Sequence, residues 1–142
     1  MGTRCGDLDP GLVVYLMRHG YAEAEQLEQV FDRQSGLLGI SGMSSDVREL
    51  LEARAQNKQA ALALEMFCYQ VRKTIASMAA ALGGLDTLVF TGGIGEHAIA
   101  LRSEICSGLQ FLSSGKLDVR VLPSQEDEQI AKDTVRLLNA QS

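Results

Sequence analysis

The sequence has no long hydrophobic run, no excess of basic residues and no basic N-terminal leader, and each shortage excludes a class of protein. Its longest uninterrupted apolar stretch, residues 12–17, is far too short to cross a bilayer. A formal net charge of −5 leaves no dense basic patch for nucleic acid or an anionic membrane. The first residues lack the basic-then-apolar order of a secretory signal. We therefore predict a cytoplasmic protein that binds neither nucleic acid nor membrane.

Cysteine is also scarce, with three residues scattered at Cys5, Cys68 and Cys106. Their odd number and the lack of a C-x-x-C pair argue against a disulfide framework and against a zinc site. Such a pattern is typical of reduced thiols in a cytosolic protein.

What the chain does contain is a series of helical patterns, with an apolar fraction of 46% that suits the buried core of one domain. Helices are expected over residues 11–18, 22–34, 46–54, 58–82, 96–109 and about 126–139. Asp9 and Pro10 mark the start of the first, because aspartate caps and proline fits the first helical position. Residues 36–45 are predicted to form a packed loop, after which Ser44 or Ser45 would cap the next helix.

Two segments have the short apolar pattern of β-strands, residues 86–91 and 119–122. A helix lies between them, so they form a β-α-β unit with parallel pairing. Two parallel strands alone make a marginal sheet, because such strands need covered faces and neighbours. We therefore expect an α/β fold in which helices pack on a small parallel sheet that lacks some of its strands, and a chain that is a fragment or needs a partner.

Glycines follow the first strand at residues 92, 93 and 95. They bring bare backbone and a helix N-terminus to one place, which a nucleotide could approach closely. Residues 93–98 also fit the dinucleotide pattern G-x-G-x-x-G/A, but the acid expected at the end of the next strand is missing, since Asp118 precedes that strand and Glu126 lies well beyond it. A dehydrogenase is thereby disfavoured, and a tight turn without a ligand stays open as the alternative.

Four stretches stand out by their order and spacing. They are residues 1–10, 36–48, 88–96 and 122–127. Together they resemble the C-terminal third of enzymes of the acetate kinase family, which includes propionate and butyrate kinases. The resemblance covers essentially the whole chain. The resemblance implies a partial actin-like (ribonuclease H-like) domain, in which residues 1–142 would be the distal part of the C-terminal domain and the N-terminal domain would be absent.

The resemblance also implies a reaction, the reversible ATP-dependent phosphorylation of a short-chain carboxylate to an acyl phosphate. ATP/ADP and Mg²⁺ would be the cofactors, a short-chain carboxylic acid the second substrate, and a homodimer would form through the C-terminal domain. The family's other phosphate-binding segments are missing here. This chain is therefore expected to carry only the adenosine-side half of the site and to be inactive alone. A non-catalytic nucleotide-binding or dimerisation module stays open as the alternative.

The same resemblance assigns two residues to the phosphates and the metal. Arg4 would sit at the phosphoryl-transfer site, where a planar guanidinium can meet two phosphoryl oxygens. Glu126 would help to hold Mg²⁺, through water. Without the resemblance, Arg4 would be interpreted as a solvated terminal arginine and Glu126 as an acid that stabilises a helix N-terminus.

Asp46, Val47 and Arg48 belong to a stretch that contacts the nucleoside in the family, with the pattern S-x-D-x-R. Aspartate can accept hydrogen bonds from ribose hydroxyls, and arginine can stack on a purine. Without the resemblance, Asp46 would be a first-turn helix acid and Arg48 a surface residue.

The glycine segment, by the same resemblance, borders the adenosine. Gly92, Gly93 and Ile94 would lie nearest to it. His97 stands where acetate kinases usually carry asparagine beside the purine, and an imidazole there could still donate a hydrogen bond or stack.

Overall fold

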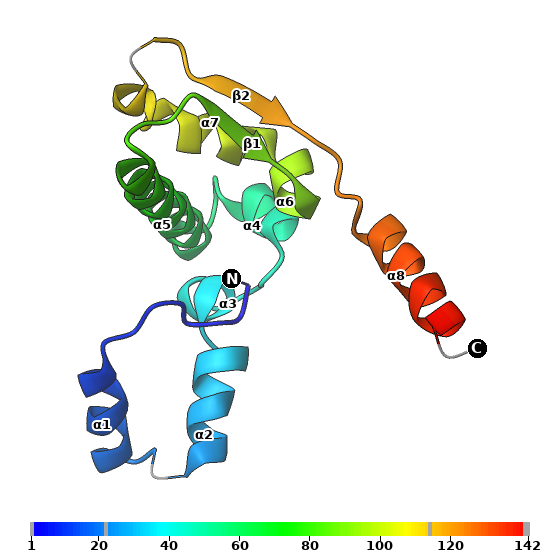
Figure 1. Ribbon diagram of the computed structural model, residues 1–142. Helices are drawn as coiled ribbons and strands as arrows, with labels where there is room; N and C mark the ends of the chain where they lie inside the picture. Colours follow the sequence, from blue (N-terminus) through cyan, green and yellow to red (C-terminus); the bar gives the residue numbers. More distant parts are fainter. Residues whose placement is uncertain (1, 22, 114, 141–142) are drawn as a thin grey trace. The chain divides into compact units, whose positions relative to one another are not determined.

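The computed structural model describes residues 2–21, 23–113 and 115–140, and the chain divides into two compact units, Met1–Thr74 and Ile75–Ser142. Its elements are, in order, α1 (Pro10–Arg18), α2 (Ala24–Glu28), the π-helical η1 (Gln29–Arg33), α3 (Gly36–Ser41), α4 (Val47–Ala53), α5 (Lys58–Leu82), β1 (Thr87–Phe90), α6 (Gly92–His97), α7 (Ile99–Ser107), the 3₁₀-helical η2 (Gln110–Leu112), β2 (Asp118–Val121) and α8 (Glu126–Ala140) (Figure 1). Among the described residues, no helix is both long enough and apolar enough to span a membrane.

The first unit begins with α1 and α2, which run in opposite directions (Figure 1). The predicted start of α1 is confirmed, because the Asp9 carboxylate accepts a hydrogen bond from the Gly11 N–H at 2.6 Å and Pro10 takes the first helical position. The helix predicted over 22–34 is instead divided into α2 and η1. Its expected first residue, Ala22, lies outside the described residues.

The prediction of a loop over residues 36–45 is wrong, because the first six of these residues form α3. Glycine normally disfavours a helix, but here it is needed for close packing. A Cβ on Gly39 would lie 2.5 Å from the backbone oxygen of Gln34, so no larger residue fits without a shift of the backbone. The helix ends at Gly42, whose φ of 65° provides the left-handed C-cap.

Helix α5 spans Lys58–Leu82, the range predicted from its sequence. Asn57 caps it, since its side-chain oxygen accepts hydrogen bonds from the N–H groups of Gln59 and Ala60 at 2.8 and 3.1 Å. Leu64 is completely buried, whereas Leu62 is 43% exposed. The helix therefore has one buried stripe and one exposed side.

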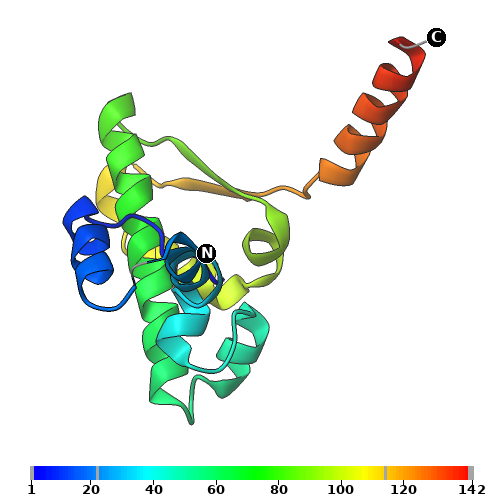
Figure 2. The ribbon, with the colours of Figure 1, turned by 90° about the horizontal axis from the view of Figure 1, so that it is seen from below.

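The second unit contains the sheet, in which β1 and β2 lie side by side (Figure 2). They pair in parallel, from Thr87 opposite Asp118 to Phe90 opposite Val121. This confirms the predicted α/β fold with a small parallel sheet. No other strand occurs in residues 2–21, 23–113 and 115–140, and all four residues of β2 are exposed.

The helix predicted over 96–109 starts earlier and is broken in two. Helix α6 covers Gly92–His97, Ala98 leaves the helical conformation with a ψ of 71°, and α7 follows. The Arg102 guanidinium donates hydrogen bonds to the carbonyl oxygens of Gly95 and Glu96 at 2.7 and 2.9 Å. These bonds satisfy carbonyls that the end of a helix leaves without partners. The glycine segment is thus one short helix and not a loop.

The three cysteines are free thiols. Cys68 is buried, while Cys5 and Cys106 are half-buried. Burial raises the pKa of the Cys106 thiol, and the positive charge of Arg102 opposes this shift.

Two leucines on α5 test this arrangement of the core. Leu64→Ala should lower the free energy of unfolding by about 2–5 kcal/mol, because it removes a completely buried side chain and leaves a cavity. Leu62→Ala, on the exposed side of the same helix, should change it by about 0.5 kcal/mol or less. Urea unfolding followed by circular dichroism measures both. Equal losses for the two variants would contradict the burial pattern of α5.

Candidate functional site

Residues 2–5, which contain Arg4, form a segment without regular secondary structure whose backbone is hydrogen-bonded to residues of and around η1 and α3. Three backbone hydrogen bonds hold it: Cys5 N–H to Phe31 O at 2.8 Å, Ser35 N–H to Thr3 O at 2.9 Å, and Leu38 N–H to Gly2 O at 2.9 Å. A Cβ added to Gly2 would lie 3.2 Å from both the Cβ and the carbonyl oxygen of Ser45. Two of the four motif stretches, residues 1–10 and 36–48, therefore meet within the first unit.

The Arg4 side chain is exposed, and it makes no hydrogen bond or ion pair with any residue that the structure describes. Its backbone is nevertheless fixed on both sides, through Thr3 and Cys5. Without a partner among the described residues, the guanidinium has all five of its N–H donors available to an incoming anion. Exposure alone is equally what a solvated arginine would show, so the phosphoryl role stays a prediction.

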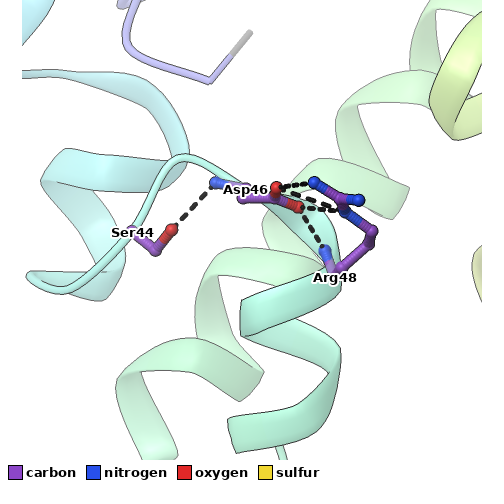
Figure 3. A network of polar contacts seen from close by, with 3 residues as sticks. All are labelled: Ser44, Asp46 and Arg48. Carbon is purple, nitrogen blue, oxygen red and sulfur yellow. Dashed lines mark hydrogen bonds and ion pairs between the residues drawn. The ribbon is translucent and has the colours of Figure 1, made fainter.

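Asp46 and Arg48 form a polar network at the start of α4 (Figure 3). The Asp46 carboxylate accepts from the Arg48 backbone N–H at 2.8 Å, from its Nη2 at 2.6 Å and from its Nε at 3.2 Å. Asp46 is thus the N-cap of α4, and the predicted cap at Ser44 or Ser45 is wrong. The reason is local, because Asp46 is the last residue with extended backbone before the helix and its carboxylate reaches the amide two residues on.

The charges of this pair reinforce each other. Hydrogen bonds from the Arg48 side chain, and then from its backbone amide, lower the pKa of Asp46 from 3.8 to about 2. The Asp46 carboxylate in turn raises the pKa of Arg48. The Arg48 side chain is 84% exposed, so it is accessible for stacking. Both Asp46 oxygens are occupied by Arg48, and contact of this pair with a nucleoside stays a prediction.

Val47, the residue between them, is only 5% exposed. Its side chain therefore packs in the interior, and only its backbone is placed to meet a ligand. The nearby Ser41 was not identified from the sequence, although it organises this turn. Its hydroxyl donates to the Ser44 carbonyl oxygen at 3.0 Å and accepts from the N–H groups of Met43 and Ser44 at 3.2 Å. The Ser44 hydroxyl then accepts from the Asp46 N–H at 3.0 Å.

In the second unit, the Glu96 carboxylate joins the glycine segment to the residues after β2. One oxygen, Oε1, accepts hydrogen bonds from the N–H of Gly92 at 2.9 Å and from the N–H of Ser124 at 2.8 Å. The other two motif stretches, residues 88–96 and 122–127, therefore meet there. Neither Glu96 nor Arg102 was identified from the sequence. Glu96 had a local signal, since an acid four residues after a glycine can return to the amide at the helix start.

The predicted nucleotide-contacting residues of this unit are accessible. Gly93, Ile94 and His97 are exposed, and Gly92 is half-buried with a φ of 73°. A Cβ added to Gly92 or Gly93 would meet no atom within 4 Å. There is therefore open space beside the backbone of both glycines, and their contact with a nucleotide stays a prediction.

Glu126 is exposed at the first position of α8. No group of three or more histidine, cysteine, aspartate or glutamate side chains that could hold a metal ion occurs in the part of the chain that is described. Magnesium commonly uses one or two carboxylates and completes its coordination with water and substrate phosphates. A single exposed glutamate fits this mode, and the magnesium role of Glu126 stays a prediction.

The low pKa of Asp46 has a measurable consequence. The folded pKa of about 2 lies below the ordinary value of 3.8, so the ionised carboxylate stabilises the fold above about pH 4 and loses this effect as the pH falls towards 2. Asp46→Asn keeps a capping oxygen but removes the charge. It should be less stable than the wild type near neutral pH, and the difference should shrink on acidification. Thermal unfolding over a pH series measures it, and a difference independent of pH would contradict the pairing.

Comparison with known proteins shows the same likeness throughout the chain. Residues 1–137 match the acetokinase family. Acetate kinase from Treponema denticola is 45% identical, over 97% of this chain and 40% of its own length. The crystal structure of Porphyromonas gingivalis acetate kinase superposes with a TM-score of 0.85 at 37% identity, over 97% of this chain and 40% of that one. The crystal structure of a propionate kinase from Francisella tularensis superposes with a TM-score of 0.79 at 34% identity, over 87% of this chain and 37% of that one.

The chain thus spans about 40% of the length of these acetate kinases. The expected match to the C-terminal third is therefore wrong in its extent. The assignment of the chain to a family does not depend on how much of the relatives it spans. The likeness covers nearly all of this chain, at well above 30% identity. The chain belongs to the acetate kinase family.

Proposed function

We propose that this chain provides the adenosine-side part of an acetate kinase-type phosphotransferase, which transfers a phosphoryl group reversibly between ATP and acetate or another short-chain carboxylic acid. The observation that supports this best is the acetate kinase likeness over 97% of the chain. The geometry adds a second support, because the four motif stretches meet in pairs, one pair in each unit. The alternative is a nucleotide-binding or dimerisation module without catalysis.

In this proposal Arg4 stabilises the phosphoryl group during transfer. Charge spreads over the equatorial oxygens of that group, and a planar guanidinium can donate to two of them at once. The backbone bonds around Thr3 and Cys5 hold the arginine in place, so its side chain alone must be ordered when the phosphate arrives.

Nucleoside contacts are proposed for each unit by itself. Arg48, with its exposed guanidinium, stacks on the purine, while Asp46 accepts from a ribose hydroxyl. The backbone at Gly92, Gly93 and Ile94 borders the adenosine, with His97 beside the base. No side chain larger than hydrogen covers the glycines, so a flat ring can approach the backbone closely.

Glu126 would hold Mg²⁺ through water. The bound ion supplies charge neutralisation at the phosphates, while Glu126 fixes where the hydrated ion sits. Asp127 and Glu128 follow directly and add negative charge at this helix start. We further propose a cytoplasmic homodimer as the working form of the enzyme.

Gly93→Ala tests the nucleotide surface without disturbing the fold. The added methyl group meets no protein atom within 4 Å and lies in a helix, which alanine favours over glycine, so stability should not fall, but the methyl group would occupy the space of the adenosine. We expect ADP to bind about tenfold more weakly, equivalent to about 1.4 kcal/mol, in isothermal titration calorimetry. Gly115→Ala, which is equally unobstructed, is the matched control and should bind ADP like the wild type. Unchanged binding by Gly93→Ala would place the nucleotide elsewhere.

Catalysis by the chain alone is a separate question. We expect no formation of acetyl phosphate or propionyl phosphate above background when the chain is incubated with Mg-ATP and the acid, because phosphoryl transfer needs groups on several sides of the phosphate. A coupled assay for ADP release, checked by hydroxamate detection of the acyl phosphate, measures this. Turnover at about 1–100 s⁻¹, as in ordinary kinases, would show that the chain carries a complete active site.

A further inference from the structure

Glu96 links its own helix, α6, to Ser124, which follows it by 28 residues in sequence. The parallel ladder ends with a backbone hydrogen bond from the Leu122 N–H to the Phe90 oxygen at 2.9 Å. Beyond that point the backbones of the segments after β1 and β2 are not hydrogen-bonded to each other directly. The Glu96 carboxylate connects them instead, because it accepts hydrogen bonds from the N–H groups of both Gly92 and Ser124. One side-chain oxygen therefore continues the connection that the sheet begins.

The Glu96 side chain is well fixed for this role. The carbonyl oxygen of Glu96 accepts a hydrogen bond from the Arg102 guanidinium at 2.9 Å, so a side chain of α7 fixes the backbone of Glu96. The Glu96 side chain then points back to the start of α6. The residue is half-buried, and hydrogen bonds to an ionised carboxylate are stronger than those between neutral groups.

We propose that Glu96 is a positioning residue that keeps the magnesium-holding segment in register with the adenosine-bordering glycines, an inference that rests on the proposed function. Ser124 lies two residues before Glu126, and Gly92 lies directly before Gly93. Holding both amides on one oxygen fixes the distance between the acid and the nucleotide surface. Mg²⁺ bound near Glu126 and a nucleotide bound at Gly93 are then coupled through Glu96.

The coupling predicts a specific defect. Loss of Glu96 should reduce the gain in ADP affinity that Mg²⁺ provides, because Glu126 is then no longer held in place. Affinity for ADP without Mg²⁺ should change by about twofold or less, since the exposed glycine backbone remains. A residue that merely stabilised α6 would instead alter both affinities in parallel.

The variants are Glu96→Ala, which removes the acceptor, and Glu96→Gln, which keeps an acceptor oxygen but loses the charge. Asp86→Asn is the matched control, because Asp86 is an exposed acid of the same unit whose carboxylate makes no hydrogen bond or ion pair with any described residue. Circular dichroism verifies that each variant is folded. If Glu96→Ala does not fold, Glu96→Gln carries the test.

The first measurement needs no nucleotide. Hydrogen exchange followed by NMR should show the Ser124 and Gly92 amides exchanging about tenfold faster in Glu96→Ala, as expected for loss of a hydrogen bond to a charged group, with a smaller effect in Glu96→Gln and none in Asp86→Asn. Unchanged exchange at Ser124 would overturn the proposal outright, whatever the chain binds.

The second measurement is calorimetric titration with ADP, with and without Mg²⁺. A wild-type chain that gains affinity from Mg²⁺, together with a Glu96→Ala variant that loses most of this gain, supports the positioning role. A gain that persists in Glu96→Ala overturns that role while leaving the proposed function intact. A wild-type chain that binds no ADP overturns the proposed function, and with it the role of Glu96 towards the nucleotide.

Discussion

Three short helices of this protein, α1, α4 and α6, each have a backbone amide in the first turn that donates a hydrogen bond to a carboxylate. A helix leaves its first four N–H groups without internal partners, and in helices as short as α4 and α6 these groups are a large share of the backbone. Asp9, Asp46 and Glu96 each supply the missing acceptor, at 2.6, 2.8 and 2.9 Å. The need is greatest in α6, because three of its six residues are glycine, which disfavours a helix.

Two of these carboxylates do more than cap, and both lie in motif stretches. Asp46 also binds the Arg48 guanidinium, and Glu96 also binds the Ser124 amide. Local folding and the geometry of the candidate site therefore use the same atoms. A nucleoside that contacts Asp46 must compete with Arg48 for the carboxylate, and the low pKa of Asp46 ensures that this group can only accept hydrogen bonds at neutral pH.

The parts of the fold that could be predicted from the sequence are those with a local cause. The Asp9–Pro10 start of α1, the full span of α5 and the parallel pairing of β1 and β2 follow from capping, composition and the β-α-β pattern. Helix α3 could not be predicted, because its glycine is required by a contact with Gln34 that no pattern reveals. The Glu96–Ser124 bond is equally invisible, since it joins residues that only the folded sheet brings together.

In the proposed function, binding and catalysis place different demands on the chain. The nucleotide contacts proposed for each unit, the open backbone at Gly92 and Gly93 in one and the accessible guanidinium of Arg48 in the other, are provided by local folding. Phosphoryl transfer needs opposing groups around the phosphate, held to fractions of an ångström. Within the described residues, Arg4 is the arginine that the family likeness assigns to that role, and its side chain has no partner that fixes it. In the proposed role, the phosphate itself would have to order this guanidinium, so binding of the anion would come before transfer.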